Sequence, residues 1–459
     1  MSAGAGPPRA AVLFAAAALA AKLAVLALVL DAHPNAFVFI DTGTYLRPAR
    51  ALLEKGTFSP SPEAAPAPEI NRTPGYPLVL AAVRAVSAAP WAPSLAGALF
   101  AFGTALVTAA LAARLFGPRA GAVAAAIVSL EPGSFLYSLS ILSDTPFTFF
   151  LMLGVSALAG FAAGERRAAG AAGLWLAVAT LVRPLSYYLL VPAAVLVWFV
   201  ARRARPVRAV AAFLVAPVLL VGGWKVRNLF RAGTFALSPI ASSELLFYRA
   251  APAAAWAEGV PLSEMQERLG NRERWFRSGG GTEREIFGDR RYADLFPETS
   301  RLSLSDLDAR WRRQAVRILA EHPVFAAAAA ARGAALLLLT PPSFIFGVRF
   351  GFVVPGPELL EAYENVEVTR VLTLLRAEAP AFFAVSAVLT LLLAGLWVAA
   401  AGGVRASWRQ IPAPVHAALL GTFLYVVAVS SGAESGDDRY RLPLVPIAAV
   451  YAARRLSAP

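Results

Sequence analysis

The stretch AAVLFAAAALAAKLAVLALVL (residues 10–30) is apolar over a length that can cross a membrane. The hydrocarbon core of a bilayer is about 30 Å thick, which requires roughly 20 residues of helix. The run follows a lone Arg9, as in a signal peptide, but it is long for a signal sequence and further apolar runs follow it. We therefore expect residues 10–30 to form the first transmembrane span.

Similar apolar runs recur along the whole chain. The composition agrees, because 58% of the 459 residues are hydrophobic and only 15% are charged, which is unlike a soluble domain. The runs show no two-residue alternation, so they predict helices rather than barrel strands. The fold expected is an all-α, polytopic membrane helix bundle with roughly 10–12 transmembrane helices. The later runs lie at residues 75–113 (broken near APWAP), 120–138, 142–163, 168–182, 185–201, 209–229, 324–345, 380–401, 413–431 and 440–453.

The charge of each loop between these runs predicts the side of the membrane on which the loop lies. The loops at 114–119, 166–167 and 202–208 are basic, whereas residues 31–74 and the turn near 131–144 are acidic or lack bases. The positive-inside rule assigns the basic loops to the cytoplasm. The net charge of +13 therefore indicates loop anchors rather than a nucleic-acid partner, since the bases form no single basic face.

The run at 324–345 conflicts with this rule if it crosses fully. The acidic segment 346–379 would then lie inside, and the basic segments RASWRQ (405–410) and ARRLSAP (453–459) would lie outside. We expect instead that 324–345 enters the membrane and returns, which gives ten full crossings; eleven or more is the alternative. Three regions follow: an N-terminal transmembrane module (1–230) with an outer loop (31–74), a charged periplasmic loop insert (231–322) and C-terminal transmembrane segments (323–459).

The stretch FIDTGTYLRPARALLEKG (39–56) places a carboxylate, Asp41, beside the membrane. Tyr45, Ala49, Leu52 and Leu53 follow at helical spacing, which predicts a short amphipathic helix with Asp41 near its N-terminus. A solvated acid, or one that complements the helix dipole, would explain Asp41 without chemistry. A charged group near a bilayer that faces a polar cavity with a partner is the functional alternative.

Other polar groups are predicted on the same outer side. Arg72 stands in NRTPGYPLVLAAV (71–83), and Asp144 begins a span in SLSILSDTPFTFFLML (138–153), where Ser143 or Asp144 could simply cap the helix and Pro146 suits its first turn. Glu131 is expected to end a span rather than to act in catalysis. Arg183 is flanked by two apolar runs and needs an acid or a phosphate partner.

The order of these motifs resembles a known family. The segments DTGTY, RTPGYPLVLA, LSDTPFTFFLML, LVRPLSYYLLVP, GGWKVRNLFRAGTFALSP, AEHPVFAAAAAARGAALLLLTPPSF and DDRYRLPLVPIAAVYAA together resemble bacterial membrane glycosyltransferases of the protein O-mannosyltransferase and aminoarabinose transferase type. These belong to the glycosyltransferase-C superfamily and are like glycosyltransferase family 39. The resemblance implies an enzyme of the cytoplasmic (inner) membrane that takes a sugar from a polyprenyl phosphate and places it on a hydroxyl of a lipid, glycan or protein outside the cytoplasm.

The resemblance also implies site residues. The catalytic acid of the family's first loop corresponds to Asp41, and its second acidic position corresponds to Asp144; Thr42 stands where some relatives have another acid, which argues against a paired-acid or metal role there. Displacement of a phosphate requires a base near the acceptor hydroxyl and cations near the leaving phosphate. Asp41 is the expected base, and direct displacement would invert the anomeric carbon. The expected substrate- or phosphate-binding residues are Tyr45, Arg72, Tyr76, Arg183, Lys225, Arg227, Arg439 and Arg441.

Simpler roles exist for several of these cations. Lys225 and Arg227 could lie at a span end with their charges in the interface, and Arg439 and Arg441 could pair with Asp437 and Asp438. His33, His322 and His416 show no metal-ligand spacing, and no nucleotide fingerprint occurs, so no cofactor is indicated; a divalent metal is the alternative left open. The alternative functions are a transporter or flippase of a polyprenyl-linked lipid, for which we find no internal repeat, and a scaffold protein without a common cavity.

Overall fold

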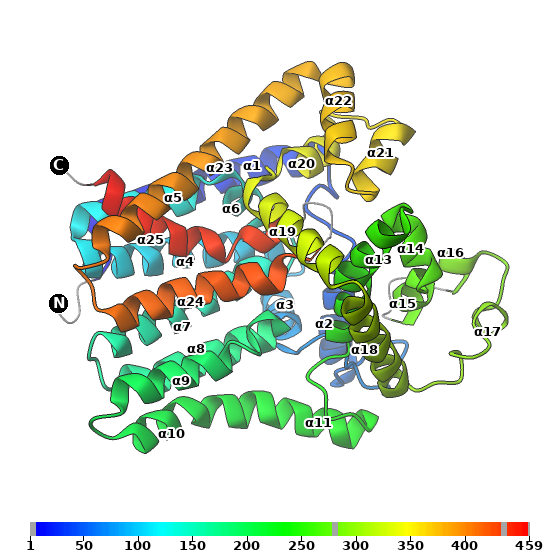
Figure 1. Ribbon diagram of the computed structural model, residues 1–459, viewed down its shortest axis with the longest axis horizontal. Helices are drawn as coiled ribbons and strands as arrows, with labels where there is room; N and C mark the ends of the chain where they lie inside the picture. Colours follow the sequence, from blue (N-terminus) through cyan, green and yellow to red (C-terminus); the bar gives the residue numbers. More distant parts are fainter. Residues whose placement is uncertain (1–5, 278–282, 433–437, 458–459) are drawn as a thin grey trace.

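The chain folds into helices throughout its described length. The computed structural model describes residues 6–277, 283–432 and 438–457, and no β-strand occurs within these ranges. Figure 1 shows most helices side by side in one bundle, with a smaller group gathered at one end. The predicted all-α fold is therefore confirmed.

Six helices of the described chain are long and apolar enough to cross a membrane. They are α1 (Arg9–Ala32), α4 (Ala92–Phe116), α7 (Asp144–Ala162), the continuous helix Pro206–Ala232 made of α10 (Pro206–Ala216), η2 (Pro217–Gly222) and α11 (Gly223–Ala232), α23 (Pro380–Ser407) and α24 (Ala413–Ser430). Proline lacks the backbone N–H that an α-helix needs, which explains why Pro217 begins a wider π-helical stretch inside the helix Pro206–Ala232.

Four shorter apolar helices lie among the long ones. They are α3 (Gly75–Val86), α5 (Pro118–Leu130), α8 (Ala168–Val182) and α9 (Leu190–Ala201). The helix α25 (Leu444–Leu456) is almost wholly buried, and α6 (Pro132–Tyr137) and η1 (Pro184–Ser186) are single turns between spans. The break that APWAP predicts separates α3 from α4. The exact number of crossings stays a prediction.

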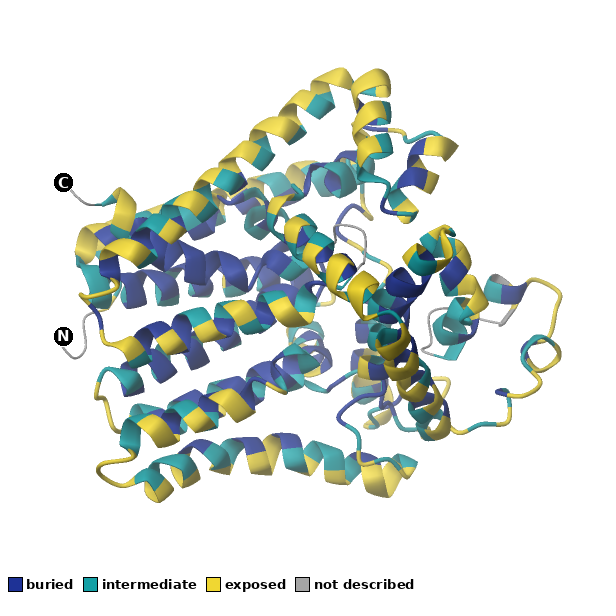
Figure 2. Cartoon of the chain, viewed as in Figure 1, coloured by how far each residue is buried: buried dark blue, intermediate teal, exposed yellow. Residues whose placement is uncertain are grey.

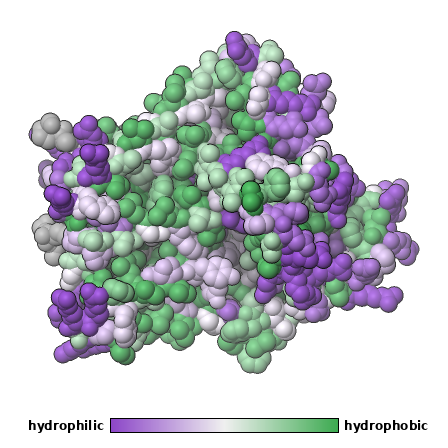
Figure 3. Space-filling view, viewed as in Figure 1, coloured by the Kyte–Doolittle hydropathy of each residue, from purple (hydrophilic) through white to green (hydrophobic). Residues whose placement is uncertain are grey.

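Apolar side chains on the outside of the bundle identify the lipid-facing surface. Leu219, Leu391 and Val398 are 69%, 71% and 73% exposed on the peripheral helices. Figure 2 shows these peripheral helices exposed around a buried centre, and Figure 3 shows a hydrophobic middle between two hydrophilic ends. Apolar groups would not cover so much of a surface in water. The protein is a multi-pass membrane protein.

Small residues allow the helices to approach closely. A Cβ atom at Gly173 on α8 would lie 1.8 Å from the carbonyl oxygen of Phe213 on α10, and one at Gly403 on α23 would lie 1.8 Å from that of Tyr451 on α25. Any larger residue would push these backbones apart. Glycine contacts of this kind are typical of packing between membrane helices.

The segment whose crossing was in question is bent. α18 (Leu304–Glu321) and α19 (Pro323–Leu339) meet at an angle of 102° across His322. α19 therefore begins at the end of a polar helix and leads into α20 (Ser343–Arg349), α21 (Pro357–Glu364) and α22 (Val368–Glu378). This geometry is that of a broken span or a re-entrant segment, the second of which the charge pattern predicts.

The charged insert has a small hydrophobic cluster of its own. Its helices are α12 (Ile240–Leu245), η3 (Leu246–Ala250), α13 (Ala251–Glu258), α14 (Leu262–Arg268), α15 (Asn271–Arg277), α16 (Glu283–Phe287), α17 (Tyr292–Leu295) and α18. Phe247, Met265, Leu307 and Trp311 pack together between them. In Figure 1 these helices lie at one end of the bundle, opposite the end that holds both termini.

The basic loops share the other end. Arg114 at the end of α4 pairs with Glu165 after α7 at 3.1 Å, which brings the first two loops together. Figure 1 shows the turn between α9 and α10 at this same end, near the marked termini. The clustering agrees with the common side that the positive-inside rule assigns to these loops.

Candidate active site

Asp41 directly precedes α2 (Thr42–Lys55), the short helix that the residue spacing predicts. Thr42 fixes the start of this helix, because its hydroxyl donates to the carbonyl of Ile141 at 2.9 Å and accepts from the N–H of Phe39 at 2.9 Å. The Asp41 side chain makes no capping hydrogen bond. A capping role therefore does not explain this carboxylate.

Two arginines bind the two oxygens of the Asp41 carboxylate. Arg72 donates from Nη2 to Oδ1 at 2.7 Å, and Arg439 donates from Nη1 to Oδ2 at 2.9 Å. The side chain of Asp41 is only 20% exposed, and those of Arg72 and Arg439 are 19% and 11% exposed. Ion pairs sheltered in this way are screened much less than surface pairs.

Two residues of α2, Thr44 and Tyr45, bind the guanidinium of Arg72. Its Nε donates to the Thr44 hydroxyl at 2.9 Å and its Nη1 to the Tyr45 hydroxyl at 3.1 Å, while the group lies 4.5 Å from the Tyr45 ring centroid. Glu69 accepts from the backbone N–H of Arg72 at 3.0 Å. The loop before α3 and the helix α2 thus present Arg72 to Asp41 in one orientation.

A second acid and arginine lie beside the first set. Arg183, after α8, forms an ion pair with Asp144, the first residue of α7, and its guanidinium lies 4.6 Å from the Tyr440 ring centroid. The Ser143 hydroxyl makes no helix cap and instead hydrogen-bonds the Tyr45 hydroxyl at 3.0 Å. The capping explanation of Ser143 and Asp144 is therefore wrong in this structure, because both side chains face residues from other segments.

Charge controls the protonation of Asp41. Burial raises the pKa of its carboxyl, but the positive charges of Arg72, Arg439 and Arg183 together outweigh burial and hold the pKa well below its usual range. Asp41 is therefore ionised at neutral pH. While both arginines bind it, the carboxylate is a weak base.

The structure places the remaining predicted residues in different surroundings. Tyr76 joins the cluster, since its ring meets that of Tyr45 edge to face at 5.0 Å. Lys225 on α11 contacts the Tyr187 hydroxyl at 3.1 Å. Arg227 donates to the backbone carbonyls of Glu69 at 2.6 Å and Phe58 at 3.2 Å. Arg227 thus holds the backbone of the loop between α2 and α3.

Arg441 belongs to a buried network behind the cluster. It is fully buried, donates to the carbonyls of Leu337 at 3.0 Å and Thr340 at 2.7 Å, and lies 3.7 Å from Glu131. Glu131 caps α6 through the N–H groups of Gly133 and Ser134, in line with the structural role expected of it.

Asp438 completes this network. Its Oδ1 accepts from the Tyr137 hydroxyl at 2.6 Å and its Oδ2 lies 3.6 Å from Arg441. Asp438 and Arg441 are the two ends of the turn η4 (Asp438–Arg441), so the network fixes the turn that carries Arg439 and Tyr440. Asp437, the other acid considered as a partner for these arginines, lies outside the described residues.

Sequence reasoning missed Tyr440. Its ring lies 4.6 Å from the Arg183 guanidinium and 5.1 Å from that of Arg439, so one aromatic ring contacts both of these positive groups. The pattern DRYR, with an aromatic residue between two arginines, was the available signal. Within the described ranges no group of three or more His, Asp or Glu side chains has a geometry suited to a metal ion.

The fold and the site together define a multi-pass helical membrane protein in which two arginines from distant segments bind one loop carboxylate. Residues 71–223 match the model of the family described as dolichyl-phosphate-mannose-protein mannosyltransferase. This segment carries Arg72, Tyr76, Asp144 and Arg183. Over this segment, the match confirms the resemblance to membrane glycosyltransferases of the protein mannosyltransferase type that the motifs indicate.

Solved structures of two kinds are similar to the chain. The apo oligosaccharyltransferase of Archaeoglobus fulgidus has 12% identity and a TM-score of 0.48, over 96% of this chain and 50% of that one. ArnT from Cupriavidus metallidurans bound to undecaprenyl phosphate has 15% identity and a TM-score of 0.41, over 97% of this chain and 78% of that one. The chain thus spans half the length of the archaeal protein. No curated protein matches it.

Proposed function

We propose that the protein is a membrane glycosyltransferase that moves a sugar from a polyprenyl phosphate to a hydroxyl acceptor, with Asp41 as the general base. The observation that supports this best is the binding of both Asp41 oxygens by arginines from two distant segments, with the Arg183–Asp144 pair alongside. A sheltered acid among three guanidinium groups offers both a base and a phosphate site.

The proposed reaction is a single displacement. The acceptor hydroxyl oxygen attacks the anomeric carbon and forms the new glycosidic bond, while the bond from that carbon to the phosphate oxygen breaks. The hydroxyl proton passes to Asp41, and the electron pair of the broken bond leaves with the polyprenyl phosphate. Attack from the side opposite the leaving group inverts the anomeric configuration. Arg183 and Arg439 would stabilise the charge that grows on the phosphate.

Binding of the donor would also make Asp41 a better base. In the structure both carboxylate oxygens are occupied by arginines, and this pairing lowers the pKa of the group. A phosphate that accepts hydrogen bonds from Arg439 would release Oδ2 of Asp41 for the acceptor hydroxyl and would partly neutralise the charge that depresses the pKa. Arg72, which Thr44 and Tyr45 also hold, would keep Asp41 in position.

Other residues have supporting roles in this proposal. Asp144 orients Arg183, and Tyr45 and Tyr76 form a wall beside Arg72. Lys225, which donates to the Tyr187 hydroxyl, has no direct contact with Asp41 in this proposal. Arg227 and Arg441 are not assigned to the phosphate, because each binds backbone carbonyls. The basic loops would face the cytoplasm, so the site would open on the outside of the inner membrane, beneath the loop 31–74 and the insert 231–322.

The proposal is tested by transfer of radiolabelled sugar. Purified full-length protein is incubated with a labelled polyprenyl-phosphate sugar and a membrane extract from a deletion strain, which supplies unmodified acceptor. We expect label in the acceptor and release of polyprenyl phosphate, with Arg183→Ala requiring roughly tenfold or more donor because a charge-assisted contact is lost. Movement of the labelled lipid across a vesicle membrane without any transfer would instead favour the transporter.

A further inference from the structure

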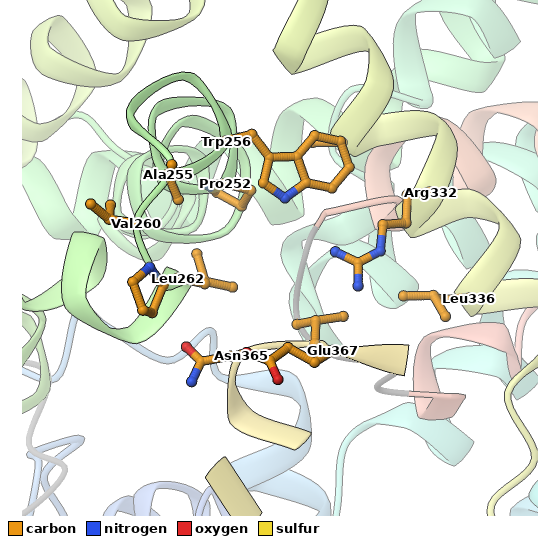
Figure 4. Close-up of a pocket in the computed structure, with 14 residues that line it drawn as sticks. Pro252, Ala255, Trp256, Val260, Leu262, Arg332, Leu336, Asn365 and Glu367 are labelled. Atoms are coloured by element: carbon orange, nitrogen blue, oxygen red, sulfur yellow. The ribbon is translucent and has the colours of Figure 1, made fainter. Parts of the chain in front are cut away.

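A second cavity lies away from Asp41, between α13, α19 and the turn that follows α21. It has a volume of about 370 Å³, and Trp256, Arg332, Leu336, Val366 and Glu367 are among the residues that line it. Figure 4 shows the Arg332 guanidinium and the Trp256 indole at the same opening. None of these residues has a role in the proposed transfer reaction.

Arg332 is the unusual residue of this cavity. It is the only charged residue of α19, PVFAAAAAARGAALLLL. Among the described residues no carbonyl or carboxylate pairs with it, and its guanidinium carbon lies 5.4 Å from the centroid of the Trp256 ring. Glu367, across the cavity, pairs with Arg370 at 3.1 Å. An arginine on an apolar helix is costly unless it has a partner, and its planar fork matches the geometry of carboxylate and phosphate groups.

The surface around Arg332 is suited to a lipid chain. Ala329, Arg332 and Leu336 line the cavity at helical spacing, and the same stripe of α19 continues to Phe325 and Leu339, which are 40% and 41% exposed. An apolar stripe thus extends from the cavity in both directions. Trp256 is 38% exposed beside it, and tryptophan is enriched at the level of lipid head groups.

The cavity wall is built from distant segments and includes a strained residue. Asn365 accepts from the backbone N–H of Ser263 at 3.1 Å and from its hydroxyl at 2.8 Å, which joins the turn to α14. Val366 has a φ angle of 58°, the only positive φ among the described residues other than glycine. Such a conformation is costly for a β-branched residue and concentrates at ligand sites.

We infer that this cavity binds the phosphate head group of an amphiphile, with Arg332 on the phosphate, Trp256 beside the head group and the chain along Phe325 or Leu339. The source of the phosphate is a polyprenyl phosphate or an anionic membrane phospholipid, which share this chemistry. The site is separate from Asp41 and does not depend on the transferase proposal.

Photo-crosslinking tests this site. Full-length protein in neutral detergent is labelled with a diazirine analogue of farnesyl phosphate, and labelled peptides are mapped. We expect label on 252–262 and 325–339, reduced about tenfold by Arg332→Gln but unchanged by Arg317→Gln, an exposed arginine on the adjacent helix α18. Asp41→Asn should also leave this label unchanged, so the result is independent of transferase activity.

Competitors identify the ligand. Displacement by farnesyl phosphate alone would assign a polyprenyl phosphate, and equal displacement by dihexanoylphosphatidylglycerol would assign an anionic phospholipid. Equal displacement by glucose 1-phosphate, which has no lipid chain, would contradict the proposal that the ligand is an amphiphile. If neither segment is labelled, or if wild type and Arg332→Gln are labelled equally, the proposal that Arg332 binds a phosphate in this cavity is wrong.

Discussion

Arg439 donates a hydrogen bond to Asp41 across 398 residues of sequence, at 2.9 Å. The contact joins the turn before the last helix to the loop after the first one. Because Arg72 takes the other oxygen of the same carboxylate, Asp41 is where three regions of the chain meet. Loss of either arginine would therefore change both the charge and the position of the acid.

Arg439→Gln should weaken donor use more than it weakens folding. The substitution removes one ion pair to Asp41 and one proposed phosphate contact, and a charge-assisted hydrogen bond is worth about 1.5–3 kcal/mol, or roughly tenfold to a hundredfold in binding. The measurement is KM for the polyprenyl-phosphate sugar with purified protein. Arg231→Gln, an exposed arginine at the end of α11, is the matched control and should leave KM unchanged. An unchanged KM in Arg439→Gln would remove this residue from the donor site.

Short-range sequence patterns predict much of the helical fold, but only some of the contacts in the candidate site. Helix α2 and the break between α3 and α4 follow from short-range spacing and proline, which act within a few residues. The motifs predict the arginines and the pairing of Arg441 with Asp438. They do not predict the partners of Asp41, because a contact such as Asp41–Arg439 depends on how all the spans pack. The same reason explains why the sequence does not predict the backbone carbonyls that Arg227 and Arg441 bind.

The Asp438 network should make stability depend on pH. Burial raises the pKa of Asp438 to about 6, against the lowering effects of Arg441 and Tyr137. The folded protein therefore keeps this proton to a higher pH than the unfolded chain, whose value is near 3.8. Its contribution to stability is present below the unfolded pKa and is lost as pH rises through about 6.

Thermal unfolding in detergent between pH 5 and pH 7.5 checks this effect, a window that brackets the folded pKa at roughly one unit either side. Asp438→Asn cannot titrate and should reduce the fall in Tm across that range. Glu298→Gln removes an acid that is 80% exposed and should leave the pH dependence as in wild type. Identical pH profiles for wild type and Asp438→Asn would show that Asp438 does not titrate in this window.

The orientation of the protein can be tested by labelling, since the natural chain has no cysteine. Single cysteines at Ser61 and Asp289 should react with an impermeant maleimide in intact cells, because the outer loop and the insert are expected outside. A cysteine at Arg203, in the basic turn between α9 and α10, should react only after permeabilisation. The opposite pattern would place the Asp41 cluster on the cytoplasmic side and would remove the proposed extracytoplasmic donor site.

The most direct test of the account is the transfer rate of Asp41→Asn. Asparagine keeps the size of aspartate and can accept a hydrogen bond, but it cannot take the acceptor proton, and loss of a general base commonly lowers a rate by about 10² to 10⁴. The assay measures radiolabelled sugar transferred from a polyprenyl phosphate by purified protein, with thermal unfolding measured on the same sample. Thr44→Val removes the hydroxyl that accepts from Arg72 and donates to the backbone carbonyl of Asp41, so it is the control for local disturbance and should keep most of the activity. We predict a loss of at least about a hundredfold in Asp41→Asn with the fold intact; wild-type transfer by this variant would contradict the assignment of Asp41 as the base.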